Sequence, residues 1–400
     1  MTDAEVTGLA VGSDTLEFRP KLKPWDLETR DVTIAADSSA ASTMLIFQAI
    51  FPFLLFASND RGDPINLTIS GGTNVSWSLS YEYLDQVLLP ALERAFGIRV
   101  ERSLKSRGWS LGKITRGTVV FTIHPMKPDE PLRLRESVCD LTADDLDVVA
   151  VDASIVAPWA MHESLKESLV QDLGDFFPGA DVEFKVAEDS GDDSRIYVLL
   201  VAKSEADIRW GRDVLTSVPK KSRGKGGKTG AKATASVSEN VARKVSKELF
   251  AEVSAGGVVD EFLQDQLVIF QALAEGRSSF PGSGATTKND AATVPSPKKE
   301  SMTPAEAANS NNGSAGTAGL DQALKGLKIG EPERKDMVFV PFGEGSTHTA
   351  TARWVVSKLL RNKVFWYNDG RICEGIGMQS EKKHPEQQLS ARFGGTQGNE

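Results

Sequence analysis

The sequence predicts a mixed α/β protein that carries a small inserted α/β domain. In the first third of the chain, stretches of strand-like alternation are interleaved with stretches of helical periodicity. Near Asp140 the pattern changes, and a second alternation of strands and helices runs for about a hundred residues. Its expected strands are 147–152, 182–186 and 195–202, and its expected helices are 161–173 and 205–215.

Length, net charge and cysteine content limit the kinds of protein to which this sequence can belong. Four hundred residues allow roughly two to three domains. The net charge of −9 argues against indiscriminate nucleic-acid binding by the whole surface, although it allows a local basic groove. Two cysteines, no visible signal peptide and no apolar run long enough for a bilayer predict a soluble protein of a reducing intracellular compartment.

The first strong helix signal is residues 39–56, which follow a short strand expected within 6–18. This stretch is apolar on nearly all sides, so we expect the helix to be buried all round. Gln48 is its only strong hydrogen-bonding group and needs a partner there. A structural hydrogen bond and a ligand contact are both open for Gln48.

A strand at 65–69 is expected to lead into the tight turn Gly71-Gly72-Thr73-Asn74. Ser80 is suited to cap a helix over 81–96, and Gly97 is suited to end it. Pro90 should kink this helix, because proline lacks the backbone N–H of a helical turn.

Basic residues gather between the strands expected at 98–101 and 118–124, with Trp109 among them. They are Arg102, Lys105, Arg107, Lys113 and Arg116. Cations beside an aromatic ring suit a nucleic-acid backbone and a stacked base. A solvated loop is the alternative interpretation.

Two long segments are predicted to be flexible because they are rich in Gly, Ser and other small or polar residues. These are the basic linker 219–232 and the segment 281–335. Between them we expect two helices, 238–253 and 258–274. Asp265 and Gln266 border the apolar face of the second helix, and a carboxylate there needs a partner or a ligand.

A strand at 337–342 should lead through a Gly-rich turn into a helix whose first turn holds His348. Ser346 and Thr347 are good helix caps, and five apolar residues define the expected buried face: Ala352, Val355, Val356, Leu359 and Leu360. The helix N-terminus favours a bound anion, and a neutral imidazole aimed at a phosphate is a nucleophile. A histidine that only hydrogen-bonds locally is the alternative.

Several of these stretches, taken together and in order, resemble the RNA 3′-terminal phosphate cyclase family in its eukaryotic form. The matching motifs are Gly12-Ser13 with Leu16-Glu17-Phe18-Arg19-Pro20, Ser39–Phe56, Gly71-Gly72-Thr73-Asn74, Val87-Leu88-Leu89-Pro90, Arg107-Gly108, Gly256–Leu267 and Gly343–Trp354. Each motif is weak by itself. Their joint presence covers most of the chain outside 141–235 and 281–335.

The resemblance implies a fold of repeated βαβαββ units, shared with enolpyruvyl transferases, plus an inserted α/β domain. It implies ATP-dependent conversion of an RNA 3′-phosphate end to a 2′,3′-cyclic phosphate, with Mg²⁺ as the divalent ion and a nuclear location. By motif, His348 corresponds to the nucleophile that becomes adenylylated. The implied nucleotide-binding residues are Gln48, Phe262, Leu263, Gln264, Asp265 and Gln266. We take Arg107, Lys113 and Arg353 as candidate RNA-binding residues.

The expected domain organisation follows from the same match. Residues 1–140 would form the first part of the core and 141–235 the inserted domain. The second part of the core would comprise 236–280 and 336–375, with a linker at 281–335 and a polar tail at 376–400.

The chain also departs from the family pattern. The family's opening Glu-Gly-Gly-Gly-Gln segment has no counterpart in the sequence. Its Gly-Thr-Ala-Gly-Ser reads Ser38-Ser39-Ala40-Ala41-Ser42 here, so two glycines that permit close backbone approach are replaced. These departures leave open a second interpretation, a catalytically inactive cyclase-like protein that binds RNA or a pre-ribosomal partner. An enolpyruvyl-transferase relative is a third, weaker interpretation.

Overall fold

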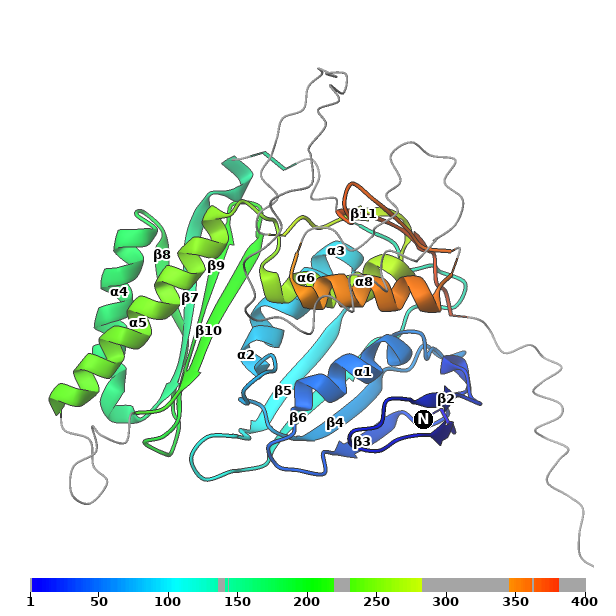
Figure 1. Ribbon diagram of the computed structural model, residues 1–400, viewed down its shortest axis with the longest axis horizontal. Coiled ribbons are helices and arrows are strands. Elements are labelled where there is room, and N and C mark those ends of the chain that lie inside the picture. Colours follow the sequence, from blue (N-terminus) through cyan, green and yellow to red (C-terminus); the bar gives the residue numbers. More distant parts are fainter. Residues whose placement is uncertain are drawn as a thin grey trace, which may run out of the picture.

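The computed structural model describes residues 2–135, 141–142, 144–218, 231–282, 345–361 and 363–380. Within these residues the strands form four sheets, two of four strands, one of three and one of two. The two-stranded sheet is the N-terminal hairpin of β1 (Glu5–Thr7) and β2 (Glu17–Arg19), which is followed by the short helix η1 (Pro24–Asp26). Figure 1 shows the two larger sheets side by side, with helices between and around them.

The first structural unit has the order βαβαββ. Its elements are β3 (Asp31–Ala35), α1 (Thr43–Leu55), β4 (Ile65–Gly71), α2 (Tyr81–Tyr83) with its continuations η2 (Leu84–Leu88) and α3 (Leu89–Phe96), β5 (Val100–Ser106) and β6 (Gly117–Ile123). The strands lie in the order β3-β4-β6-β5. β3 and β4 are parallel, as a crossover through α1 requires, and the other pairs are antiparallel. The predicted βαβαββ unit is confirmed.

The C-terminal elements follow the same order from the first helix onward. They are α6 (Glu261–Leu273), β11 (Glu275–Ser279), α8 (Thr347–Leu359), β12 (Phe365–Tyr367) and β13 (Ile372–Ile376). β11 and β12 both pair antiparallel with β13, just as β4 and β5 both pair with β6. This correspondence agrees with the predicted repetition of the unit.

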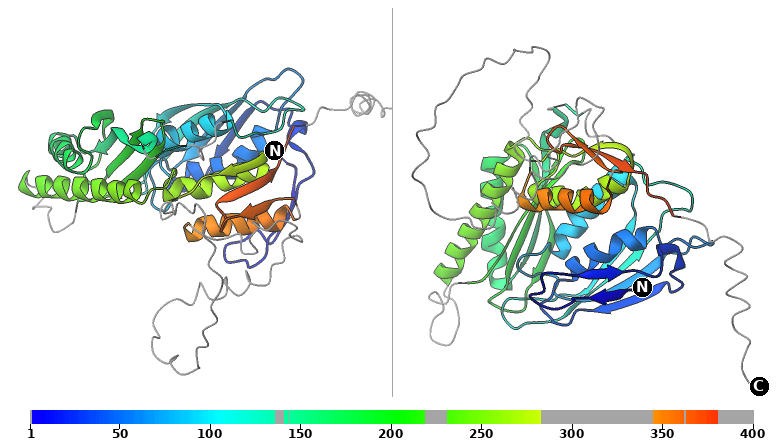
Figure 2. Two further views of the ribbon diagram at one scale, coloured as in Figure 1. Left: turned by 90° about the horizontal axis from the view of Figure 1, so that it is seen from above. Right: turned by 45° about the vertical axis from the view of Figure 1, so that its right-hand side comes forward.

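The remaining sheet contains β7 (Val148–Ala157), β8 (Asp181–Asp189), β9 (Ile196–Ser204) and β10 (Arg209–Thr216), and we call it the 148–216 sheet. The short helices η3 (Asp144–Leu146) and η4 (Trp159–Met161) flank β7. Helices α4 (His162–Phe176) and α5 (Ala231–Ser254) cover this sheet, which separates them from α2 (Figures 1 and 2). Hydrogen bonds such as Gln86 Nε2 to Ser154 Oγ (2.8 Å) join the sheet to η2.

Helix α1 anchors the core of the first unit. Phe47 is 1% exposed, and its ring lies 4.7 Å from that of Phe51 and 4.5 Å from that of Phe121. The prediction that this helix is buried all round is wrong, because Leu45 is 55% exposed. The helix packs on β4 and β6, and Phe51 contacts Phe270 of α6, so the side opposite these contacts meets solvent.

The helix expected at 205–215 is instead the strand β10. Asp207 adopts a left-handed backbone (φ 54°) in a tight turn, where its N–H donates to Ser204 O (2.9 Å). A left-handed residue interrupts a helix, and the chain then pairs antiparallel with β9, with Trp210 opposite Ala202. Cross-strand pairing therefore overrides the helical spacing of the apolar residues.

The capping predictions for the helix 81–96 are confirmed. Tyr83 N donates to Ser80 Oγ (3.0 Å), and Gly97 ends α3 with φ 68°. The irregularity expected at Pro90 appears in the preceding turn η2, where the helix widens to π-type hydrogen bonding. A wider turn accommodates the carbonyl that proline leaves without an N–H donor.

Helix α8 buries part of the predicted face: Val356 is buried, and Ala352 and Leu360 pack against the cluster that contains Trp366. Val355 is 38% and Leu359 77% exposed, whereas Thr349, Arg353 and Val356 are buried. The buried residues follow a spacing of four and three, and this face packs against α6 and the Trp366 side of the C-terminal sheet. The contact partners, not the apolar count, determine which face is covered.

Several predictions lie outside the described residues: residues 219–230 of the linker 219–232, the segment 283–335, the strand 337–342 and the tail 381–400. The last two residues of that linker, 231 and 232, belong to helix α5, so the prediction of a flexible linker is wrong for them. The structure describes residues 376–380, which were assigned to the tail. Met378 N donates to Leu273 O (2.7 Å), and Ser380 Oγ donates to Phe56 O (3.0 Å). Helix α5 runs across residue 235 without a break. None of the described helices is long and apolar enough to cross a membrane.

Truncating Phe47 tests this account of the core. Phe47→Ala should lower the free energy of unfolding by about 3–5 kcal/mol, because it leaves a cavity among aromatic rings. Leu45→Ala on the same helix should change it by less than about 1 kcal/mol, since Leu45 is mostly exposed. Urea denaturation followed by circular dichroism measures both, and equal losses would contradict the one-sided packing of α1.

Candidate active site

A chain of hydrogen bonds joins α1 to α6 at the centre of the candidate site. Gln48 Nε2 donates to Gln266 Oε1, and Gln266 Nε2 donates to Asp265 Oδ1 (2.6 Å). Gln48 and Gln266 lie 218 positions apart in sequence. The structure thus brings together three of the residues predicted to bind nucleotide.

His348 lies in the first turn of α8. Ser346 caps the helix by accepting from Thr349 N (3.2 Å), and the His348 side chain is exposed. Burial raises the pKa of Asp265, while the hydrogen bond from Gln266 and the charge of His348 lower it. His348 and Asp265 are therefore within electrostatic reach of each other.

The side chains of Gln264 and Leu263 do not belong to the hydrogen-bond chain of Gln48, Gln266 and Asp265. Leu263 is 2% exposed and belongs to the hydrophobic core, so its side chain cannot contact a nucleotide. Gln264 is 6% exposed and accepts from Thr349 Oγ1 (3.4 Å). A Cβ on Gly345 (φ 117°) would come within 2.4 Å of Gln264 Oε1. Gln264 thus supports the turn that leads to His348, and its part in nucleotide binding stays a prediction.

Phe262 presents a partly exposed ring at the start of α6. It is 39% exposed, its ring meets that of Tyr83 edge-on at 6.2 Å, and the Arg212 guanidinium lies 4.5 Å above it. Arg212 also pairs with Glu252 and with Glu261 (3.2 Å). Arg212 comes from β10, and because the apolar spacing of this stretch predicts a helix, its position over Phe262 could not be predicted.

Asp260 fixes the N-terminus of α6 and is completely buried. Its carboxylate accepts from the backbone of Phe262 (3.0 Å), from Tyr83 Oη (2.5 Å) and from Gly211 N (2.7 Å). Burial raises the pKa of Asp260, although these hydrogen bonds and Arg212 act in the opposite direction. This residue was inside the motif Gly256–Leu267, but only its contacts reveal its role.

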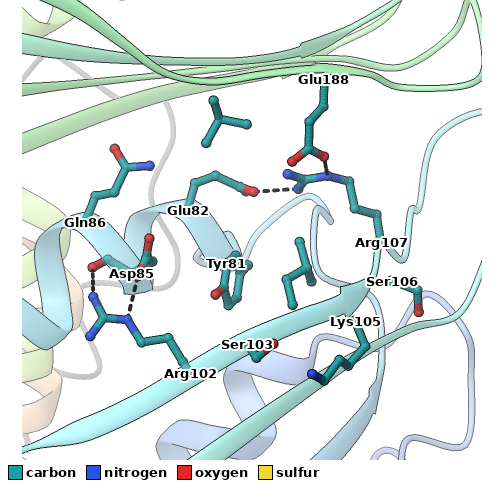
Figure 3. Close-up of a pocket in the computed structure, with 12 residues that line it drawn as sticks. Tyr81, Glu82, Asp85, Gln86, Arg102, Ser103, Lys105, Ser106, Arg107 and Glu188 are labelled. Carbon is teal, nitrogen blue, oxygen red and sulfur yellow. Dashed lines mark hydrogen bonds and ion pairs between the residues drawn. The ribbon is translucent and has the colours of Figure 1, made fainter.

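A polar groove of about 550 Å³ separates the α2–η2 helix and β5 from β8 (Figure 3). Arg107 lies across its upper end, between Glu82 and Glu188 (2.7 Å). Burial lowers the pKa of Arg107, but the two carboxylates more than compensate and raise it. At the other end Arg102 pairs with Asp85 (2.5 Å). Arg107 is thus an ion-paired wall of the groove.

The other residues predicted to contact nucleic acid differ in their exposure to solvent. The Lys113 side chain is exposed, as RNA binding requires. Arg353 is 2% exposed and lies 5.5 Å from the Trp366 ring, so the prediction that it binds RNA is wrong. Trp109 is also 2% exposed and faces Arg195 at 5.4 Å, so it cannot stack on a base. These two side chains build the interior.

Chemically, the site places an exposed imidazole at a helix N-terminus beside a carboxylate and two amides. The N–H groups of the first helical turn attract an anion, and the imidazole can attack an electrophile held there. The described residues contain no group of three or more His, Cys, Asp or Glu side chains able to hold a metal ion.

The comparisons with known proteins identify the family. A family model described as RNA 3′-terminal phosphate cyclase matches residues 1–294. The chain belongs to the RNA 3′-terminal phosphate cyclase family. Helix α8 and His348 lie beyond the matched residues, so their place in the site rests on the structure.

Individual cyclases agree with this assignment. The RNA 3′-terminal phosphate cyclase of Pyrobaculum neutrophilum is 30% identical over 287 residues, 72% of this chain and 73% of the relative. That of Thermococcus kodakarensis is 30% identical over 280 residues, 69% and 70% of the two chains. A Dictyostelium discoideum protein named as a probable RNA 3′-terminal phosphate cyclase is 26% identical over 69% of this chain and 58% of its own length.

The buried carboxylates beside α6 predict a pH dependence of stability. Burial raises the pKa of Glu252 from 4.5 to about 7, against the effect of Arg212. A carboxyl whose pKa is higher in the folded state binds more protons there, so its contribution to stability falls as pH rises from about 4.5 to 7. Glu252→Gln should remove this part of the decline. Thermal melting of both proteins across this pH range measures it, and parallel curves would contradict the raised pKa.

Proposed function

We propose that the protein is an ATP-dependent RNA 3′-terminal phosphate cyclase in which His348 is the nucleophile. The observation that carries the proposal is the convergence of His348 with Asp265, Gln266 and Gln48, from three helices distant in sequence. Membership of the cyclase family and the names of its relatives support the reaction class.

The proposed reaction has three steps. His348 attacks the α-phosphorus of ATP, and pyrophosphate leaves as AMP becomes bonded to the imidazole. An RNA 3′-phosphate oxygen then attacks the same phosphorus, and the imidazole leaves, which gives RNA–adenylate. The neighbouring 2′-hydroxyl attacks the terminal phosphorus, loses its proton and expels AMP, which closes the 2′,3′-cyclic phosphate. An unactivated phosphate is a poor electrophile, and AMP is a good leaving group.

The residues present fit ATP. The N-terminal turn of α8 offers N–H groups to phosphate oxygens, and the amides of Gln48 and Gln266 offer both donors and acceptors. The exposed face of Phe262 is available for an adenine ring. Mg²⁺, when bound, would neutralise phosphate charge, and Asp265 is the carboxylate near His348 that could hold it.

We propose that the exposed Lys113 contacts the phosphate backbone of the RNA. Arg107 can contact RNA only if it breaks its ion pair with Glu82 or with Glu188. A nuclear location is part of the proposal and rests on the family resemblance alone. The domain boundaries at residues 140 and 235 also remain a proposal.

Covalent labelling tests the first step. The 400-residue chain is incubated with α-labelled ATP and Mg²⁺ and then separated by denaturing electrophoresis. Acid-labile, base-stable label on the protein is expected for a phosphoramidate on histidine. Failure to label, together with retained binding of RNA, would support the inactive RNA-binding protein instead.

His348→Ala should reduce this labelling to background while leaving the fold intact, because the side chain is exposed at a helix start. His124→Ala is the matched control, since His124 is also partly exposed but pairs with Glu101 on the first sheet (3.2 Å). Labelling of the His348 variant at the wild-type level would remove His348 from the mechanism.

Asp265→Asn should lower the efficiency with which the protein uses ATP roughly 10-fold. A loss of this size corresponds to one charge-assisted hydrogen bond of about 1.5 kcal/mol. Stability should be unchanged, because asparagine can still accept from Gln266 and avoids burying a charge. Steady-state kinetics at varied ATP and a melting curve separate these effects. Loss of the fold would show that Asp265 is structural.

A further inference from the structure

Trp77 stands out among the side chains that the proposed mechanism does not use. It lies in the loop between β4 and α2, its side chain is completely exposed, and its backbone is left-handed with φ 64°. A bulky residue at positive φ destabilises the folded backbone by roughly 1–2 kcal/mol. Because the indole is exposed, no burial of apolar surface offsets this cost. Folding alone therefore does not account for a tryptophan here.

The loop that carries Trp77 is held firmly on both sides. Ser76 N donates to Ser110 Oγ (3.4 Å), which ties it to the loop between β5 and β6. Ser78 Oγ and Ser42 Oγ share a hydrogen bond of 2.5 Å, which ties it to the N-cap of α1. The residues on both sides of Trp77 are thus tethered, next to the N-cap of the helix that carries Gln48.

Basic side chains lie in the loop that is hydrogen-bonded to the Trp77 loop. Lys113 and Arg116 are exposed in the loop that Ser110 joins to Trp77, and Arg116 Nη2 donates to the Asp37 carbonyl (3.5 Å). Two acids contact this loop: Asp37 is exposed, and Asp192 accepts from Ser194 N (2.8 Å) and Lys113 N (3.3 Å). The aromatic ring and the basic side chains that the sequence placed around Trp109 therefore do occur together, but the ring is Trp77.

We propose that Trp77 is a stacking platform for a base of the RNA strand whose 3′-phosphate end reaches His348; this rests on the proposed function. Ser42 and Gln48 are six residues apart on α1, about 9 Å along its axis. A stacked strand covers that length in about three nucleotides, at 3.4 Å each. With Ser42 marking the Trp77 loop and Gln48 marking the reacting end, the stacked base lies about three nucleotides upstream of the reacting phosphate.

The surroundings favour a nucleic acid over a protein partner. The immediate neighbours Ser76, Ser78 and Ser110 carry hydroxyl groups. The adjoining loop exposes the cations Lys113 and Arg116 together with Ile114, which is 56% exposed, and the acids Asp192 and Asp37 contact this loop. A protein interface needs a broader apolar centre, whereas one ring with cations alongside is enough for a single-stranded backbone and base.

The test measures binding of 3′-phosphorylated, 5′-fluorescein RNA oligonucleotides by fluorescence anisotropy. Trp77→Ala should weaken binding of a six-nucleotide strand about 10-fold, and Trp77→Phe should restore most of it, because a phenyl ring still stacks. A dinucleotide is too short to reach the platform, so its affinity should not change. Trp159→Ala is the matched control: Trp159 is 66% exposed but stands on η4, next to His162.

Labelling with α-labelled ATP in the absence of RNA should be the same for wild type and Trp77→Ala. That readout reports the proposed function independently of RNA binding. Unchanged affinity of Trp77→Ala for the longer strand, an equal loss in Trp159→Ala, or no measurable RNA binding by the wild type would each overturn the proposal.

Discussion

The buried carboxylate of Asp260 connects three parts of the chain that are distant in sequence. It caps α6, accepts the hydroxyl of Tyr83 from the first βαβαββ unit, and accepts the backbone N–H of Gly211 from β10. A carboxylate without these donors would be costly at zero exposure, so the three segments are held where they can satisfy it. The position of α6, and with it Asp265 and Gln266, depends on this one group.

The packing of α8 and α1 around α6 then assembles the candidate site. Helix α8 lies on α6 through Gln264 and Thr349, which sets the turn at Gly345 and brings His348 within electrostatic reach of Asp265. Helix α1 approaches from the other side and closes the hydrogen-bond chain with Gln48. Reactive side chains on three rigid helices can hold a geometry that a loop could not.

The 148–216 sheet takes part in this arrangement. Its strand β10 carries Gly211, which bonds to Asp260, and Arg212, which stacks over Phe262 and pairs with Glu252. A segment that resembles a separate insertion in sequence therefore supplies part of the wall around the start of α6. Missing the β10 strand in the sequence also meant missing Arg212.

The sequence by itself determined the caps at Ser80 and Ser346 and the place of His348 in a first helical turn, because these depend on local periodicity and on side chains next to the backbone groups they satisfy. The βαβαββ order was implied by the family resemblance, and its first strand, β3, is not among the strands that the local pattern predicted. Only the tertiary structure decided which sides of the helices are buried. It turned Leu45 and Leu359 to solvent, enclosed Arg353, Leu263 and Trp109, and left Trp77 exposed. Burial depends on which surface arrives opposite each residue, and that surface comes from parts of the chain far away in sequence.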